Sequence, residues 1–312
     1  MADPSSELIS VEEALARLTR GVEPLSGEMV PLNLADGRVL SEDLVSKRTQ
    51  PPFPASAMDG YAVRGADVTA LPAKLRVIGE SVAGRGYHSP LKPGTAVRIF
   101  TGAPVPEGAD TIIIQENTNR SEEVVEILDG EQVGRYIRQR GLDFAEGDRL
   151  LEAGTRLSPF KLSLAASANF PEVPCVKKPV VAFIATGDEL REPGSVLQGD
   201  QIICSNSYGI AAIANRMGAS VRDLGIVGDE MEPLLAAFRR AISDGAHIIV
   251  TTGGASVGDR DLVGDALEQL GVTMGFWKIA MRPGKPLMYG QRQTDGRTVR
   301  FLGLPGNPVS SL

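Results

Sequence analysis

Four glycine-containing turns carry residue types that can bind phosphate and a metal ion. Three of them also carry acids: residues 186–189 (TGDE), 228–230 (GDE) and 253–261 (GGASVGDRD). The fourth, residues 304–308 (LPGNP), has no acid. Glycines let the backbone approach a ligand closely, helix N-termini attract anions, and carboxylates beside a phosphate are typical Mg²⁺ ligands. Any one of these turns alone is more typical of a helix cap, but four together favour a site.

A cationic segment follows the acidic turns. Between Lys278 and Arg300 there are six basic residues and one acid, in a chain whose formal net charge is −7. Pro283, Gly284 and Pro286 fix where Arg282 and Lys285 point, and two such cations suit a compact oxyanion or a phosphate. A solvated basic loop is the alternative interpretation. The segment is not a nucleotide-binding P-loop, because no glycine precedes Gly284 at the required spacing.

Strands and helices are predicted to alternate after Pro179, and these elements must position the residues of the four turns. An apolar run over 180–185 predicts a buried strand, and further strands are predicted over 221–227, 247–251 and 300–304. Helices are predicted over 207–217, 231–243 and 262–270, with another opening at Asn307-Pro308. This alternation predicts a mostly parallel α/β sheet. All four turns follow strands of that sheet, and ligands of open α/β sheets bind beyond the carboxyl ends of strands.

The first half of the chain is different. A capping box at Ser10 predicts a helix from Val11 to about residue 18, and the proline-rich stretch 47–54 is typical of a domain boundary. Short runs over 75–78, 96–99, 111–115 and 124–128 predict a small β-rich domain. Ser158-Pro159 predicts a further helix to about residue 169. The loops around Asp59, Thr101 and Asp143 indicate no reaction by residue type alone.

Composition excludes several classes of protein. Only two cysteines and two histidines occur, which leaves no disulfide framework, no CxxC metal site and little for a histidine-based catalytic relay. Cys204 is expected to be buried and inert, His247 to lie in the core and His88 at the surface. The acidic net charge argues against a nucleic-acid binder. No leader or membrane-length apolar run is found, so a cytoplasmic protein is expected.

Seven phrases, in order, carry a resemblance to a known family. They are PPFPASAMDGYAV, TGAPVPEGADTIIIQE, IRQRGLDFAEGD, ATGDEL, TTGGASVGDRD, WKIAMRPGKPLMYG and FLGLPGNPVS. Together they resemble the molybdopterin molybdotransferases, which include bacterial MoeA proteins and gephyrin E domains, from about Val11 to Ser311. The resemblance implies an enzyme of the last step of molybdenum cofactor biosynthesis. Its substrates would be molybdate and adenylylated molybdopterin, its cofactor Mg²⁺, and AMP would be released.

The resemblance also implies an architecture. It is a multidomain fold with a MogA-like α/β molybdopterin-binding domain over 178–312 and an N-terminal helix, 1–26, packed on it. An elongated β linker domain is expected over 27–46 and 142–177, and a mixed, β-rich second domain over 47–141. The family's C-terminal β-barrel is expected to be missing and the α/β domain truncated, which predicts weakened activity. Family members are homodimers with a site shared between subunits, and an upstream molybdopterin adenylyltransferase supplies their substrate.

Functional positions transfer from the family residue by residue. The expected catalytic residues are Asp59, Thr101, Asp143, Glu189, Asp229 and Asp261, with Asp229 and Asp261 as the metal ligands. Together with the glycine-rich turns, the expected cofactor-binding residues are Gly187, Asp188, Gly253, Gly254, Ser256, Lys278, Arg282, Lys285, Pro305, Gly306 and Asn307. Arg282 stands where many relatives have lysine, so the positive charge is kept while its geometry changes.

Two alternatives stay open at the level of sequence. One is a non-catalytic molybdopterin-binding scaffold of gephyrin type, although the set of five acids Asp59, Asp143, Glu189, Asp229 and Asp261 favours an enzyme. The other is a nucleotide-processing hydrolase with a related α/β domain, but that family lacks the MDGYAV domain. Molybdate or tungstate preference and the recipients of the product are not encoded in any recognisable motif.

Overall fold

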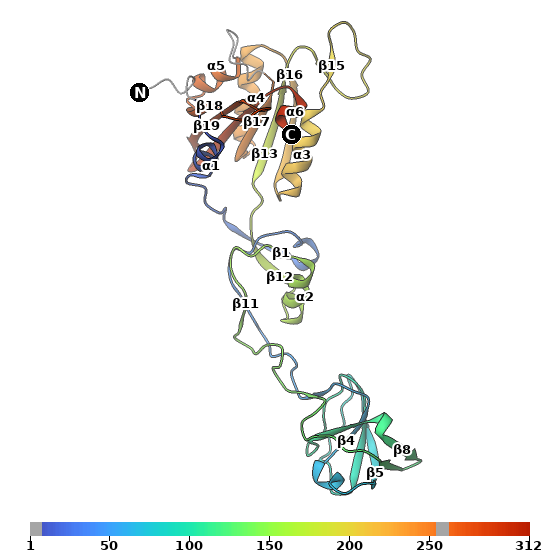
Figure 1. Cartoon of the computed structure of the whole chain (residues 1–312). Coiled ribbons are helices and arrows are strands. Elements are labelled where there is room, and N and C mark those ends of the chain that lie inside the picture. The colour runs from blue at the N-terminus through green and yellow to red at the C-terminus, as the bar shows by residue number, and fades with distance from the viewer. Residues whose placement is uncertain (1–7, 254–261) are drawn as a thin grey trace. The chain divides into compact units, whose positions relative to one another are not determined.

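The computed structural model describes residues 8–253 and 262–312, which form two compact units (Figure 1). The first unit joins the residues up to Gly27 to Val176–Leu312 and is called the α/β unit below. The second is Glu28–Cys175, called the β-rich unit. Among the described residues, no helix is long and apolar enough to cross a membrane.

A six-stranded sheet, as far as the described residues show, forms the centre of the α/β unit in the order β16-β13-β17-β20-β19-β18. The first four strands in this order are parallel, and β19 pairs antiparallel with both β20 and β18. The predicted mostly parallel sheet is therefore confirmed. The strands are β13 (Val180–Thr186), β16 (Ser220–Val227), β17 (Ile248–Thr252), β18 (Thr273–Lys278), β19 (Pro286–Thr294) and β20 (Arg297–Leu304).

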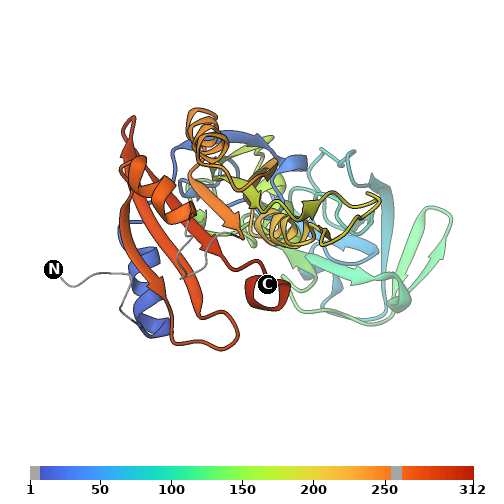
Figure 2. The same ribbon diagram turned by 90° about the horizontal axis from the view of Figure 1, so that it is seen from above.

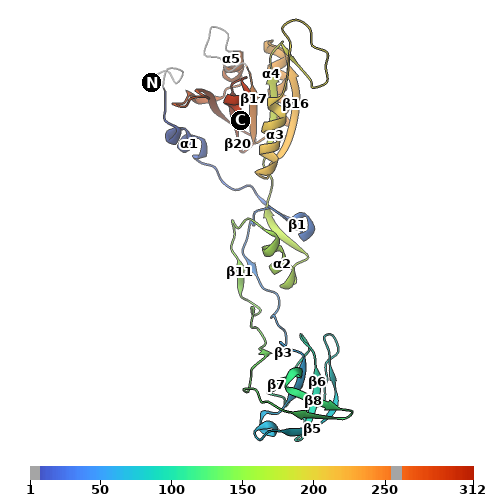
Figure 3. The same ribbon diagram turned by 45° about the vertical axis from the view of Figure 1, so that its right-hand side comes forward.

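Helices cover both faces of this sheet (Figures 1 and 3). The predicted helices are confirmed with small shifts at their ends. They are α1 (Val11–Thr19), α3 (Asn206–Arg216), α4 (Met231–Ser243), α5 (Leu262–Gln269) and the short α6 (Pro308–Ser311). A parallel pair of two-residue strands, β14 (Leu190–Arg191) and β15 (Ile202–Ile203), lies between β13 and α3. The Ser10 hydroxyl caps α1 as expected, because it accepts a hydrogen bond from the Glu13 N–H at 3.1 Å.

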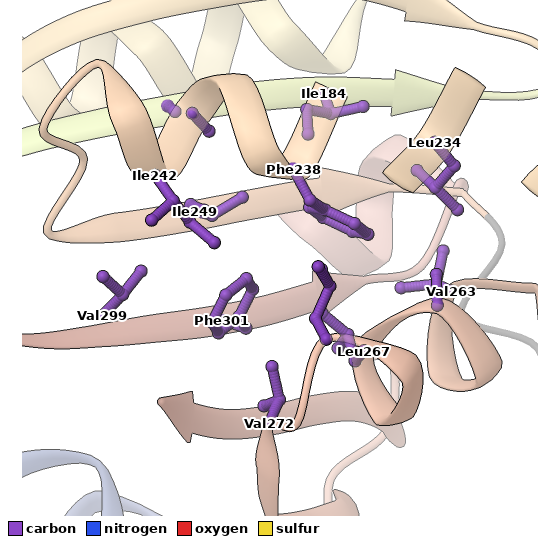
Figure 4. Close-up of a cluster of buried hydrophobic side chains, with 14 of the residues drawn as sticks. Ile184, Leu234, Phe238, Ile242, Ile249, Val263, Leu267, Val272, Val299 and Phe301 are labelled. Carbon is purple, nitrogen blue, oxygen red and sulfur yellow. The ribbon is translucent and has the colours of Figure 1, made fainter. Parts of the chain in front are cut away.

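The largest core lies between α4, α5 and one face of the sheet (Figure 4). Its centre is Phe238 of α4, whose ring meets that of Phe301 edge to face at a centroid distance of 5.9 Å. Such a pair contributes about 0.5–1.5 kcal/mol beyond the apolar area it buries. On the opposite face Ile210 of α3 packs against Phe183. Figure 2 shows α1, in blue, beside the red-orange strands, where Ala14 meets the aromatic side chains of β18 and β19.

The cationic segment 278–300 is divided between two uses. The sequence predicts a single basic cluster, but most of the segment forms β19, which was not predicted, and β20, of which only 300–304 was predicted. The Arg300 guanidinium donates to the Gly21 carbonyl at 3.2 Å, just after α1, and Arg297 donates to the carbonyl of Ile242 in the last turn of α4. Both arginines therefore satisfy carbonyls at helix ends. A count of charged residues could not predict these contacts, because it does not tell where each side chain points.

The β-rich unit contains a second six-stranded sheet within its described residues, in the order β7-β4-β6-β5-β9-β8. The four strand runs predicted in this part of the sequence are confirmed. The sheet consists of β4 (Gly60–Val63), β5 (Ala73–Ser81), β6 (Thr95–Ile99), β7 (Thr111–Ile114), β8 (Thr118–Ser121) and β9 (Val124–Ile127). Its core is made of small and branched apolar residues, among them Val63, Ile113 and Ile127, each fully buried.

The remaining part of the β-rich unit is built from short strand pairs and one helix. The strands pair as β1 with β12, β2 with β11 and β3 with β10. Their bounds are β1 (Gly27–Pro31), β2 (Leu44–Val45), β3 (Ala55–Ser56), β10 (Ile137–Arg138), β11 (Arg149–Leu151) and β12 (Glu172–Val176). Helix α2 (Pro159–Ser167) begins at Pro159 as predicted, although the Ser158 side chain makes no capping hydrogen bond. The core here includes Leu40, Leu157 and Val173.

Candidate functional site

One edge of the α/β sheet collects the sequence-predicted turns. Strands β13, β16, β17 and β20 are parallel, so their carboxyl ends lie at the same edge. Lys278 ends β18 and pairs with Pro286 at the start of β19, which places Lys285 at that edge as well. From β13 the chain moves first to β16 on one side and then to β17 on the other. Ligands of open α/β sheets bind at such a change of direction.

Three backbone segments approach one another unusually closely at this edge of the sheet. Gly253 has φ +89°, and a Cβ built on it would overlap the carbonyl oxygen of Thr186. The Gly253 N–H donates to the carbonyl of Leu304 at 3.2 Å. A Cβ on Gly306 would lie 3.7 Å from the Gly253 Cα. The ends of β13, β17 and β20 are thus joined at Gly253, a position that both its φ and the lack of space reserve for glycine.

A cavity of about 140 Å³ lies beside these glycines. Four segments line it: the end of β13 with the turn that follows, the stretch from β15 to the start of α3, the end of β17, and the turn after β20. Three of the predicted residues, Glu189, Gly253 and Gly306, are among the lining residues. The Glu189 carboxylate lies over Gly187, in space that a Cβ at that position would fill. The cavity therefore combines close backbone approach with an acid at its wall.

Asn206 is a lining residue that the sequence analysis missed. Its side chain is buried, with 7% exposure, and its Nδ2 donates to the Gly306 carbonyl at 2.7 Å. That bond fixes the orientation of the amide, and within the described part of the chain its Oδ1 is buried without a hydrogen-bond partner. A buried acceptor of this kind normally has a partner, so the Asn206 Oδ1 is a candidate for contact with a ligand in the cavity. The only signal in the sequence was an asparagine at the start of a predicted helix, which is typical of a cap.

The two cations of the stiff segment belong to a connection that packs against α6. Arg282 and Lys285 are both exposed and belong to the connection between β18 and β19, which the Ile279 N–H closes by donating to the Lys285 carbonyl at 2.9 Å. Gly284, with φ +98°, is buried, and a Cβ on it would lie 3.4 Å from the Ser310 carbonyl oxygen. The connection therefore packs against α6. The backbone that carries the two positive charges is therefore fixed next to α6, the helix that follows the Pro305-Gly306-Asn307 turn.

Two exposed acids, one from the turn after β13 and one from the turn after β16, lie next to each other. Asp188 and Asp229 are exposed, and the Asp188 carboxylate accepts a hydrogen bond from the Asp229 N–H at 3.1 Å. Gly254, Ser256 and Asp261, which were also predicted as site residues, lie outside the described residues. Within 8–253 and 262–312, no group of three or more histidine, cysteine or acidic side chains is close enough to hold a metal ion. Of the predicted metal pair, Asp229 is the described member.

The β-rich unit contains the remaining predicted residues. Asp59 and Thr101 are brought together, since the Asp59 Oδ1 accepts hydrogen bonds from both the N–H and the hydroxyl of Thr101, each at 2.8 Å. The N–H of Thr101 first, then its hydroxyl, and last the positive charge of Arg98 hold the pKa of Asp59 below its ordinary value. Asp143 is exposed and its N–H donates to the Gln50 carbonyl at 3.0 Å.

Replacing Thr101 by valine should raise the pKa of Asp59. The hydroxyl donor is lost while the backbone donor remains, so the pKa moves towards the ordinary value without reaching it. A lowered pKa gives the folded state stability above the unfolded pKa of about 3.9, which is lost as the pH falls through the folded pKa. The variant loses part of that contribution. Carboxyl-carbon NMR titration measures the shift.

The control for this change is Thr69→Val, because the Thr69 hydroxyl donates to the Ala66 carbonyl at 3.5 Å rather than to Asp59. It should leave the pKa of Asp59 unchanged. An unchanged pKa in Thr101→Val would contradict the prediction.

Comparisons with known proteins match nearly the whole chain. Residues 9–169 match the family described as MoeA N-terminal region (domain I and II), and residues 182–312 match the family described as probable molybdopterin binding domain. The chain is 37% identical over 307 residues to a Haemophilus influenzae protein named molybdopterin molybdenumtransferase, covering 98% of this chain and 74% of that one. It is 38% identical over 310 residues to molybdopterin molybdenumtransferase 2 of Mycobacterium tuberculosis, covering 96% and 75%.

A solved structure agrees. The crystal structure titled molybdopterin biosynthesis moea protein, from Pyrococcus horikosii, superimposes with a TM-score of 0.81 at 32% sequence identity. The match covers 98% of this chain and 76% of that one. Fold and sequence therefore point to the same relatives.

Proposed function

Because the chain belongs to the MoeA family of molybdopterin molybdenumtransferases, we propose that it binds adenylylated molybdopterin and molybdate at the carboxyl edge of its α/β sheet. Membership makes the chain an enzyme of molybdenum cofactor biosynthesis. The proposal adds the identity of the site, the need for Mg²⁺ and the release of AMP as the phosphoanhydride bond breaks.

The observation that carries this proposal is the cavity at the junction of β13, β17 and β20. Gly253 and Gly306 leave room for a ligand to approach the main chain, and Asn206 offers a buried acceptor without a protein partner among the described residues. A pterin has amino and ring N–H donors that such an acceptor can bind. The glycine-rich turns and the helix N-termini that follow these strand ends suit the phosphate of molybdopterin.

The two cations suit molybdate. It is a tetra-oxo dianion, and Arg282 and Lys285 belong to a connection that packs against α6, the helix that follows the turn after β20. Arginine presents several N–H donors in a plane, and lysine supplies a compact charge. We assign these two residues to binding and orienting molybdate as a substrate, with Lys278, at the end of β18, adding charge to the same edge.

The residues present fit Mg²⁺. The ion prefers oxygen ligands and often takes only one or two from the protein, and Asp229 offers an exposed carboxylate at the same edge as the cavity. Asp229 and Asp261 would hold the ion. When bound, Mg²⁺ supplies neutralisation of the charge that develops on the cleaved phosphoanhydride. Glu189 lines the cavity and is assigned to orienting the substrate within it.

The β-rich unit is proposed to act on the site of a second copy of the chain. We assign Asp59, Thr101 and Asp143 to completing that site in a homodimer, as the family resemblance implies. Asp59 fits the role because its two hydrogen bonds from Thr101 keep it ionised and fixed. An upstream adenylyltransferase would supply the substrate, and the cytoplasm is the proposed location.

Neither alternative function is favoured by an observation. A nucleotide-processing hydrolase with a related α/β domain does not account for the family match over residues 9–169. A non-catalytic scaffold agrees less well with relatives that are named transferases.

The decisive experiment measures AMP release from adenylylated molybdopterin, with each of molybdate and Mg²⁺ present or withheld. The proposal predicts that AMP appears only when both are present, and that molybdenum enters the dithiolene in equal amount. Binding of adenylylated molybdopterin without AMP release under any condition would contradict it and favour the scaffold. AMP release that ignores molybdate would favour the hydrolase.

A further inference from the structure

We propose that Asp188 is a positioning residue. Its carboxylate accepts a hydrogen bond from the Asp229 N–H and so fixes Asp229, and the negative charge of Asp188 is not required for this role. This inference rests on the proposed function, because Asp229 is given its role there. It replaces the sequence-based expectation that Asp188 binds the cofactor. Its basis is the contacts of two neighbouring turns, the one after β13 and the one after β16.

The two turns are joined by one backbone bond and one side-chain bond. The Gly187 N–H donates to the Val227 carbonyl at 3.2 Å, which continues the pairing of β13 with β16. One residue further, the Asp188 Oδ1 accepts from the Asp229 N–H at 3.1 Å. The Asp188 main chain is itself held, because its carbonyl accepts from the Arg191 guanidinium at 2.9 Å. The Asp188 carboxylate therefore extends towards Asp229 from a main chain that is itself fixed.

Gly228 makes room for this carboxylate. A Cβ built on Gly228 would lie 2.9 Å from the Asp188 Oδ1, and among the described residues it would meet no other neighbouring atom within 4 Å. Gly228 does not have a positive φ, so a side chain at this position is not opposed by backbone strain. The space above Gly228 is thus filled by the Asp188 carboxylate alone.

Neighbouring acids in the first turn face different ways. The Glu189 carboxylate folds over Gly187 and Glu189 lines the cavity, whereas Asp188 is not among the lining residues that the structure describes. Asp188 instead binds the N–H that lies two residues before α4 begins at Met231. Glu230, the N-cap residue of α4, makes no capping hydrogen bond through its own side chain. Asp188 is the side chain that fixes the path of the backbone at Asp229.

The role of an acceptor can be separated from that of a charge. In Asp188→Asn the amide oxygen can accept from the same N–H while the NH₂ group turns to solvent. In Asp188→Ala the acceptor is lost, and in Gly228→Ala the new methyl group displaces it. A positioning residue therefore predicts that Asn preserves function, while both alanine variants impair it to a similar degree.

Two readouts test this pattern. The first is hydrogen exchange of the Asp229 amide, which should be faster in Asp188→Ala and Gly228→Ala and unchanged in Asp188→Asn. The second is the Mg²⁺ concentration for half-maximal AMP release, expected to rise about ten-fold in the two alanine variants and less than about two-fold in Asp188→Asn. The control is Asp223→Ala on β16, whose carboxylate accepts from the Gly225 N–H at 2.9 Å. Asp223→Ala should change neither the exchange of the Asp229 amide nor the Mg²⁺ concentration for half-maximal AMP release.

The outcomes distinguish this inference from the proposed function. If Asp188→Asn is as impaired as Asp188→Ala in Mg²⁺ requirement, the charge itself is needed and the inference is overturned. Unchanged exchange of the Asp229 amide in Asp188→Ala also overturns it. If the wild-type chain releases no AMP, the proposed function fails, and the exchange data still decide whether Asp188 positions Asp229.

Discussion

Replacing Gly253 by alanine lowers the free energy of unfolding of the α/β unit by about 2–4 kcal/mol and abolishes AMP release. Two causes add. An L-residue at φ +89° is strained by about 1–3 kcal/mol, and the new Cβ overlaps the carbonyl oxygen of Thr186, which is part of the main chain and cannot turn aside. Relief of the overlap requires β13 and β17 to separate at the cavity. Urea unfolding followed by the fluorescence of Trp277, the only tryptophan in the sequence, reports on this unit.

Gly218 provides a matched control for this change. Its φ is +93°, close to that of Gly253, but a Cβ built on it meets nothing within 4 Å. Gly218→Ala therefore isolates the backbone strain and should lower the free energy of unfolding by about 1 kcal/mol, with AMP release retained. Equal losses in the two variants would show that close approach at Gly253 has no effect.

Replacing Lys285 by methionine raises the molybdate concentration needed for half-maximal turnover by at least about ten-fold. Methionine keeps most of the length of the side chain and removes the charge, so the change tests attraction of the dianion rather than packing. The unfolding free energy should change by less than about 0.5 kcal/mol because Lys285 is exposed. Turnover measured against molybdate concentration, at fixed adenylylated molybdopterin, gives the result.

Lys178→Met is the control for the lysine variant. Lys178 is exposed in the same unit and precedes β13, so it lies at the edge of the sheet opposite the cavity. Lys178→Met removes the same charge as Lys285→Met. The molybdate concentration for half-maximal turnover should stay within about two-fold of wild type, since charges further apart than about 10 Å are largely screened by salt. Similar shifts in both variants would indicate a general field rather than a binding site.

The elements that the sequence predicted well have strong local patterns. The apolar run of β13 is buried on both faces, and the apolar stripe of α4 repeats with helical period, so each sequence pattern indicates a single structure. Strands β18 and β19 were both missed. Their polar and apolar residues mix, glycines interrupt them, and they complete one edge of the sheet, where pairing is decided by tertiary contact.

The contacts of the candidate site were less predictable than its edge. All four turns could be recognised from glycines after a strand, and three of them from acids as well. Asn206, however, bonds to a residue 100 positions away, and Asp59 to one 42 positions away, and no local pattern encodes such a pair. Arg297 and Arg300 were counted with the binding cations because a charge count cannot distinguish a helix cap from a ligand contact.

The position of β20 in the sheet determines when the cavity can form in a newly made chain. This strand follows all other described strands in the sequence, yet it lies in the sheet between β17 and β19. While the ribosome is still adding residues before Arg297, β18 and β19 have no partner that joins them to the parallel strands. The contact from Asn206 to Gly306 forms only afterwards. The cavity is therefore completed in one late step of synthesis, and a chain interrupted before Arg297 lacks the strand end and the turn that close it.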